Sequence, residues 1–130
     1  VGYWDDADGS YNATSDQRLK KDVVNIDESI LSKVMQLKPV YYRLNHNETE
    51  TKKTIGFLAQ EVLPLFPELV KQNEEGFYSL HYADFGVIAI KVIQEQQIEI
   101  EELKKKVEEI DTLKAELELL KKMLIKNSDN

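Results

Sequence analysis

The last third of the chain is a long segment with the pattern of a coiled-coil helix. Between Asp84 and Lys126 there is no proline, and Gly86 is the only glycine. Asp84 is a candidate N-cap for this helix. Apolar residues recur at the alternating three- and four-residue spacing of a seam. Position a holds Ile93, Ile100 and Val107, and position d holds Gln96, Leu103 and Ile110.

The seam changes phase once. The next a position would be Lys114, and a three-residue step to Leu113 restores the apolar series, which continues through Leu117, Leu120 and Leu124. Such a stammer overwinds a coil locally. The helix would be about 60 Å long, too long to pack wholly on the rest of the chain. We therefore expect an oligomer held by a parallel coiled coil. A helical hairpin, or a bundle completed by an upstream domain, is the alternative.

Composition narrows the classes of function. The 130 residues carry 24 acidic and 17 basic side chains, for a net charge of −7, which argues against nucleic-acid binding because phosphates need a basic surface. There is no cysteine, so disulfides and thiolate metal sites are excluded. No apolar run approaches the roughly 18 residues of a membrane span. Neither a membrane partner nor a cofactor is predicted.

The two histidines do not suggest a metal site. His46 lies in a polar segment and is expected to be solvated, whereas His81 is expected to pack or hydrogen-bond within a strand. Neither has a partner at metal-ligand spacing. We therefore predict no metal ligands.

The pattern divides the chain into three parts, with an α+β fold: a small mixed body of short strands and helices, followed by the long helix. The parts are residues 1–14 (the end of an upstream region or a linker), 15–83 (the body) and 84–130 (the helix). Within the body, Asp27 is a candidate N-cap and 45–53 an exposed loop. We expect an extended segment at 18–26, helices at 28–37 and 59–63, and strands at 40–44, 54–58, 68–70 and 76–82.

One cluster could carry nucleophilic chemistry. A serine becomes a nucleophile when a base removes its proton, and a neutral lysine can be that base. Ser15 and Lys20 are five residues apart, which places their side chains about 140° apart on a helix and on opposite faces of a strand. A turn between them would be required. Nearby Arg18 and Lys21 could help to keep Lys20 neutral. Without further information, a capping serine and a solvated lysine are the simpler interpretation.

A second polar pair, Gln60 and Glu61, lies beside a predicted strand end. These two residues could belong to a site. The start of a helix with an exposed glutamate is the simpler interpretation.

Five motifs, in order, resemble the peptidase S74 family, the C-terminal intramolecular chaperone domain of phage endosialidases, tail spikes and tail fibres. The resemblance begins at Ser15 and extends to about residue 110. The matching strings are SDQRLKKDV (15–23), LKPVYY (37–42), IGFLAQEV (55–62), FPELV (66–70) and SLHY (79–82). His81 stands where the family often has aspartate.

The resemblance implies a homotrimer with a parallel trimeric coiled coil. Such a domain holds three chains together while an upstream β-rich fibre or spike of the same chain folds, and then cuts itself off. By the family pattern, the scissile bond would join Thr14 to Ser15, with Ser15 as nucleophile and Lys20 as general base.

The same resemblance implies that four further motif residues support the site: Asp16, Asp22, Gln60 and Glu61. For the two aspartates it implies a structural or orienting role. It places the protein in a phage virion tail, with release after maturation in the host cytoplasm. A prophage-encoded or bacterial surface protein is the alternative.

Two other functions remain open. The fold could serve as a permanent, non-cleaving trimerisation or tip module of a fibre. It could also be an unrelated coiled-coil adaptor whose body binds a peptide or receptor. The first alternative predicts trimers without scission, and the second predicts an exposed apolar patch on residues 40–82.

Overall fold

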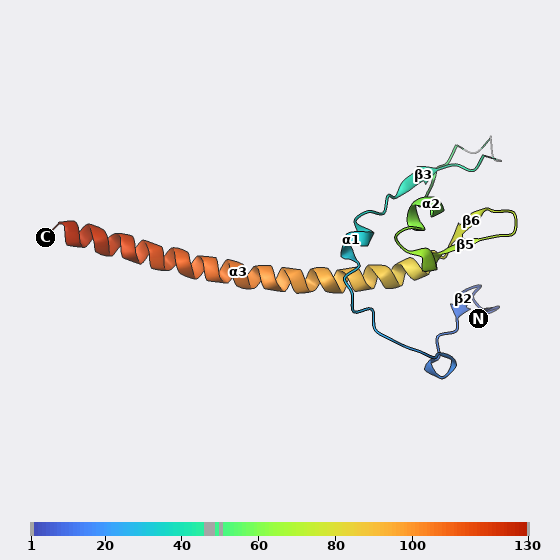
Figure 1. Ribbon diagram of the computed structural model, residues 1–130, viewed down its shortest axis with the longest axis horizontal. Coiled ribbons are helices and arrows are strands. Elements are labelled where there is room, and N and C mark those ends of the chain that lie inside the picture. The colour runs from blue at the N-terminus through green and yellow to red at the C-terminus, as the bar shows by residue number, and fades with distance from the viewer. Residues whose placement is uncertain (1, 46–48, 50, 130) are drawn as a thin grey trace.

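The computed structural model describes residues 2–45, 49 and 51–129. A small body of short elements lies at one end of a single long helix, α3 (Asp84–Ser128), which projects far beyond it (Figure 1). At about 1.5 Å per residue this helix is about 68 Å long. The predicted α+β body followed by a long helix is confirmed. Among the described residues, no helix is both long and apolar enough to cross a membrane.

The strands of the described chain form three separate antiparallel pairs. The first joins β1 (Gly2–Trp4) to β2 (Tyr11–Ala13). The second joins β3 (Val40–Tyr42) to β4 (Thr54–Gly56), and the third joins β5 (Val70–Gln72) to β6 (Tyr78–Leu80). Each strand has three residues, so no pair is stable alone. The body therefore depends on packing against helices.

Four short helical segments accompany the strands, and the first of them lies near the N-terminus, outside the core. They are η1 (Gln17–Leu19), α1 (Leu31–Val34), α2 (Ala59–Val62) and η2 (Pro67–Leu69). Helix α2 ends shortly before Pro64, and Pro67 begins η2, because proline is tolerated only in the first turn. The predicted strand at 68–70 is therefore mainly the 3₁₀ turn η2, with the strand starting at Val70.

The core joins these segments to the first turns of α3. It consists of six buried apolar residues from α2, η2, α3, the residue before α1 and the link after α2, with Val62 and Phe66 almost fully enclosed: Ile30, Val62, Phe66, Leu69, Ile88 and Val92. Phe57 stacks on Phe85 at a ring-centroid distance of 5.1 Å, which ties β4 to the start of α3. Only the first turns of α3 serve the body.

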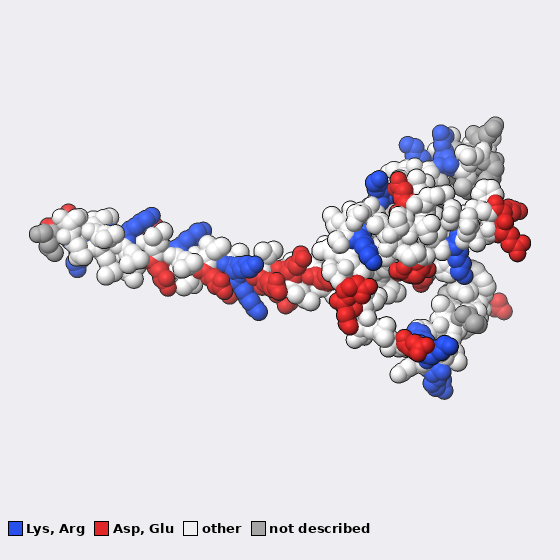
Figure 2. Space-filling view, viewed as in Figure 1, with Lys and Arg blue, Asp and Glu red and all other residues white. Residues whose placement is uncertain are grey.

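The seam predicted on α3 is exposed in the single chain. Ile88 and Val92, which are buried in the core, lie about 80° to 140° around the helix from Ile93 and Ile100 at about 100° per residue, whereas the later seam positions return toward the face of Ile88 and Val92. The seam side chains are 45% to 70% exposed: Ile93, Ile100, Leu103, Val107, Ile110, Leu113, Leu117, Leu120 and Leu124. In the single chain this apolar stripe has no cover, and Figure 2 shows charged side chains of both signs elsewhere along the helix.

Residues 2–28 form an N-terminal arm that leaves the body. The arm passes beside α3 and turns back, and Figure 2 shows an opening between it and the rest of the molecule. It begins with the β1–β2 hairpin, which the sequence interpretation of residues 1–14 as an upstream end or linker did not foresee. Gly9, which lies between the two strands, has the positive φ of +72° that favours glycine.

Candidate functional site

A short 3₁₀ turn reverses the arm directly after Ser15. Asp16 precedes the turn with extended backbone angles, and its side chain accepts a hydrogen bond from the backbone N–H of Arg18 at 2.9 Å. The turn is closed by the N–H of Leu19, which donates to the Asp16 carbonyl, and by the N–H of Lys20, which donates to the Gln17 carbonyl, both at 3.1 Å. An aspartate at such a position is a common cap.

The turn brings the two candidate catalytic side chains together. Lys20 Nζ lies 2.8 Å from Ser15 Oγ and donates a hydrogen bond to it. This is the geometry in which a neutral lysine would accept the serine proton. The turn that the five-residue spacing required is therefore present, whereas the predicted extended segment starts only after it. Both residues are exposed in the single chain.

Asp16 and Arg18 form a fork beside this pair. Arg18 Nη2 donates to Asp16 Oδ2 at 2.6 Å, and Arg18 Nε donates to Asp16 Oδ1 at 3.0 Å. The hydrogen bonds from the Arg18 side chain and backbone hold the pKa of the Asp16 carboxyl below its ordinary value, and the same carboxylate raises the pKa of Arg18. The sequence suggested that the positive charge of Arg18 would help to keep Lys20 neutral, but in the structure this charge is paired with Asp16.

Asp22 lies just beyond the pair in an unusual conformation. Its φ of +54° is in the left-handed region, and it is the one described non-glycine residue with a positive φ. Aspartate and asparagine tolerate this region better than other non-glycine residues. The structure therefore gives Asp22 a local role in turning the backbone after Lys20.

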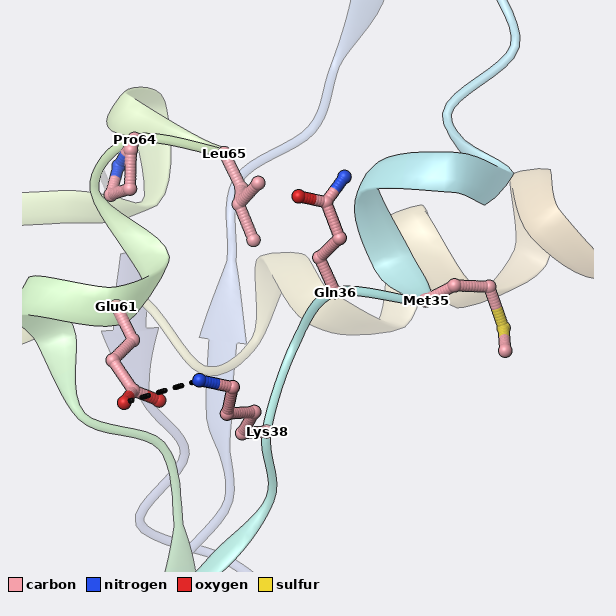
Figure 3. A pocket seen from close by; sticks show the side chains of 6 residues that line it. All are labelled: Met35, Gln36, Lys38, Glu61, Pro64 and Leu65. Carbon is pink, nitrogen blue, oxygen red and sulfur yellow. Dashed lines mark ion pairs between the residues drawn. The ribbon is translucent and has the colours of Figure 1, made fainter.

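The other two motif residues lie elsewhere. Gln60 and Glu61 belong to α2, which lies across α3 from the arm that carries Ser15 (Figure 1). Figure 3 shows Glu61 facing Lys38 across a cavity, with an Oε1–Nζ distance of 3.8 Å. The cavity measures 440 Å³ and is open to solvent between α2 and the end of α1, lined by Met35, Gln36, Lys38, Glu61, Pro64 and Leu65. The single chain does not bring Gln60 or Glu61 to the Ser15–Lys20 pair.

His81 follows β6 and is held by its backbone. Its N–H donates to the Leu69 carbonyl at 2.9 Å, and its Nδ1 lies 3.8 Å from Asp84 Oδ2. Asp84 itself lies inside the first turn of α3, and the cap position is Ala83. The N-cap predicted at Asp84 was thus wrong by one residue. The prediction for His46 lies outside the described residues.

Glu95 holds the chain directly after the arm onto α3, a contact that sequence reasoning missed. Its carboxylate accepts hydrogen bonds from Ser29 Oγ at 2.8 Å and from the N–H groups of Ile30 and Leu31 at 3.2 Å. Lys91 Nζ lies 3.5 Å from the same carboxylate, whose side chain is 13% exposed. Desolvation raises the pKa of Glu95, but these hydrogen bonds outweigh it, so the net shift is downward.

The Glu95 contact also explains where α1 begins. The predicted N-cap was Asp27, but the helix starts at Leu31 with no capping side chain from its own segment. Glu95, 65 residues away from Ile30, satisfies the free N–H groups instead. No local pattern could have shown this partner.

The sequence that begins at Ser15 matches a known protein family. Residues 15–71 match the family model Peptidase_S74, described as chaperone of endosialidase. The resemblance is therefore confirmed over this segment, which begins at Ser15 and ends in β5. It supports a role as an intramolecular chaperone. No curated protein matches the chain.

Proposed function

We propose that this chain forms a homotrimeric intramolecular chaperone that cuts itself from the upstream protein at the Thr14–Ser15 bond. The observation that carries the proposal is the 2.8 Å contact between Lys20 Nζ and Ser15 Oγ. The Peptidase_S74 match begins at this same serine. The match argues against an unrelated coiled-coil adaptor.

The cleavage would proceed in two steps, transfer of the Thr14 acyl group to Ser15 Oγ and hydrolysis of the resulting ester. Neutral Lys20 takes the proton from Ser15 Oγ, which attacks the Thr14 carbonyl carbon. The C–N bond breaks, an ester forms between Thr14 and Ser15 Oγ, and the proton passes from Lys20 to the departing amine of Ser15. Water then hydrolyses the ester, which leaves a carboxyl group on Thr14 and restores the Ser15 hydroxyl.

A single turnover does not demand a strong catalyst. A barrier of about 22 kcal/mol gives a half-life of about half an hour. Lys20 and Ser15 are exposed in the single chain, and burial favours the neutral form of lysine. Assembly of three copies around the pair would therefore favour the reactive state.

The exposed stripe on α3 supports assembly through a coiled coil. Nine apolar seam side chains are 45% to 70% exposed in the single chain, because the described core of the body includes only Ile88 and Val92 from the first turns of the helix. Three parallel helices would cover this stripe. They would also hold the upstream chains at an effective concentration commonly in the millimolar range, which helps a β-rich fibre or spike of intertwined chains to form.

The biological setting follows from the family. A chaperone of endosialidase implies a phage-associated protein, and we place this chain on an upstream tail fibre or spike that is released in the host cytoplasm. After cleavage, the upstream fibre or spike lacks the domain that helped it to assemble. It is then stable because it unfolds slowly, and not because its folded state is lower in free energy. The alternative is a prophage-encoded or bacterial surface protein. In each of these settings we propose the same domain boundaries, between residues 14 and 15 and between residues 83 and 84.

Intact mass spectrometry tests the proposal. The chain is incubated at neutral pH beside Ser15→Ala and Lys20→Ala, with Ser32→Ala and Lys53→Ala as matched controls that lie away from the arm. We expect the native chain and both controls to lose residues 1–14, while the two site variants stay whole. Light scattering on every sample reports the number of chains.

Two outcomes count against cleavage. If all five proteins stay whole and trimeric, the domain is a permanent trimerisation or tip module, and the Ser15–Lys20 assignment is wrong. If Ser15→Ala or Lys20→Ala is shortened at the native rate, another group cuts the chain.

A further inference from the structure

The Ser15–Lys20 contact depends on a short turn that Asp16 caps. Lys20 reaches Ser15 only because residues 17–19 form a 3₁₀ turn, and that turn has a single side-chain cap, Asp16. One Asp16 oxygen, Oδ1, accepts both the backbone N–H of Arg18 at 2.9 Å and Arg18 Nε at 3.0 Å. The other oxygen, Oδ2, accepts Arg18 Nη2.

Asp16 thus makes two separable interactions. The cap involves the backbone of Arg18 and needs only an acceptor oxygen. The fork involves the Arg18 side chain and needs a negative charge to be strong. The Arg18 side chain is 88% exposed, and exposed ion pairs contribute little. The cap is therefore the interaction that decides whether the turn forms.

Resting on the proposed cleavage, we propose that Asp16 is a positioning residue, which caps the 17–19 turn and thereby places Lys20 Nζ against Ser15 Oγ. Asp16 does not contact Ser15 Oγ or Lys20 Nζ by any hydrogen bond seen among the described residues, so its effect is exerted through the backbone. The ion pair with Arg18 is secondary to the cap.

The substituted side chains separate these roles. Asp16→Asn keeps an acceptor oxygen for the Arg18 N–H and loses the charge, whereas Asp16→Ala loses both. Arg18→Ala keeps the backbone N–H that the cap needs and loses the fork. Asp8→Ala is the matched control, because Asp8 Oδ1 also caps a turn, accepting the N–H of Ser10 at 2.8 Å, but does so in the β1–β2 hairpin.

The first measurement is the rate at which the full chain loses residues 1–14. A displacement of about 1 Å can slow a reaction a hundredfold, and we expect Asp16→Ala to cut at least about tenfold more slowly than the native chain. Asp16→Asn, Arg18→Ala and Asp8→Ala should stay within about threefold of the native rate, because the cap survives in each. A near-native rate in Asp16→Asn would show that the cleavage needs the acceptor oxygen of residue 16 and not its charge.

The second measurement does not depend on cleavage. Side-chain NMR follows the signal of Lys20 Nζ, with Ser15→Ala as the reference for a broken contact. We expect Asp16→Ala to move this signal toward its position in Ser15→Ala, and Asp16→Asn to leave it near the native position.

The two measurements distinguish the failures. If the native chain never cuts but the Lys20 signal depends on Asp16 as stated, the positioning holds and the proposed cleavage fails. If Asp16→Ala cuts at the native rate, or leaves the Lys20 signal unchanged, the positioning is wrong. If Arg18→Ala is as slow as Asp16→Ala, the ion pair positions the lysine and the cap does not.

Discussion

Gly56, in the IGFLAQEV motif, is buried where the end of β4 meets the start of α3. A Cβ at this position would lie 2.5 Å from Tyr82 Oη and 3.0 Å from Tyr42 Cε1. Tyr82 Oη is already engaged, because it accepts a hydrogen bond from the N–H of Phe57 at 3.0 Å. Gly56→Ala must therefore push the Tyr82 ring away and break that hydrogen bond.

The magnitude follows from these contacts. Overpacking a tight site costs about 1–3 kcal/mol, and we expect about 1–2 kcal/mol here because the Tyr82 hydroxyl can move toward solvent. Tyr82→Phe alone removes one hydrogen bond, worth about 0.5–1.5 kcal/mol. It also removes the clashing oxygen, and the next Tyr82 atom, Cζ, is at an ordinary contact distance of 3.5 Å. Of the close contacts, the double variant keeps only the 3.0 Å contact with Tyr42, so it should lose less stability than the sum of the two single variants.

Urea unfolding followed by near-UV circular dichroism measures the four free energies of the cycle. All samples need the same protomer concentration, since assembly contributes to stability. Gly86→Ala is the control, because a Cβ there meets nothing within 4 Å, and it should raise or preserve stability. Amide exchange at Phe57 should quicken in every variant that loses the Tyr82 contact. If Gly56→Ala and Tyr82→Phe add within about 0.5 kcal/mol, the proposed clash is refuted.

Three further predictions concern the core, the arm and its attachment. Phe66→Ala should lower the free energy of unfolding by about 3–5 kcal/mol in urea, because Phe66 is 2% exposed; a loss below about 1 kcal/mol would contradict the assigned core. Asp22→Val should destabilise the arm by about 1–2 kcal/mol relative to Asp22→Gly, because the φ of Asp22 is +54°. Limited proteolysis would detect this as faster cutting between residues 16 and 28 in Asp22→Val. Equal cutting rates in the two variants would contradict the prediction. The lowered pKa of Glu95 gives stability that is present above the ordinary glutamate pKa and is lost as the pH falls through the lowered one. Thermal melts across that acidic range should show this loss in the native chain and less of it in Glu95→Gln, and parallel curves would contradict the assignment.

The long helix was predictable because its pattern repeats over many turns. The short elements of the body were located to within a few residues, since Pro39, Pro64 and Pro67 separate them. The β1–β2 hairpin was missed because its short strands contain Gly2, Asn12 and Ala13, which are depleted in strands. The start of α1 was missed because its N–H groups bind Glu95, a partner from a distant helix.

The candidate site was predictable in part. The motif identified Ser15 and Lys20 through a resemblance, and spacing alone could only say that they needed a turn. One local signal for that turn was present: Asp16 is a capping residue type followed two positions later by the N–H that it binds. Nothing local could place Gln60 and Glu61 relative to Ser15, because that depends on how α2 and the arm pack around α3.

The contact at Glu95 has a mechanical consequence. Directly after the arm, the chain reaches α3 at Ser29, Ile30 and Leu31, where one carboxylate holds it by three hydrogen bonds. Tension from an upstream fibre would therefore peel the chain from this carboxylate before it loads the core around Phe66. We expect single-molecule pulling between the arm and the end of α3 to show a small early rupture, absent in Glu95→Ala, ahead of the main unfolding event. In the proposed assembly, a growing fibre could therefore pull on the arm without unfolding the body.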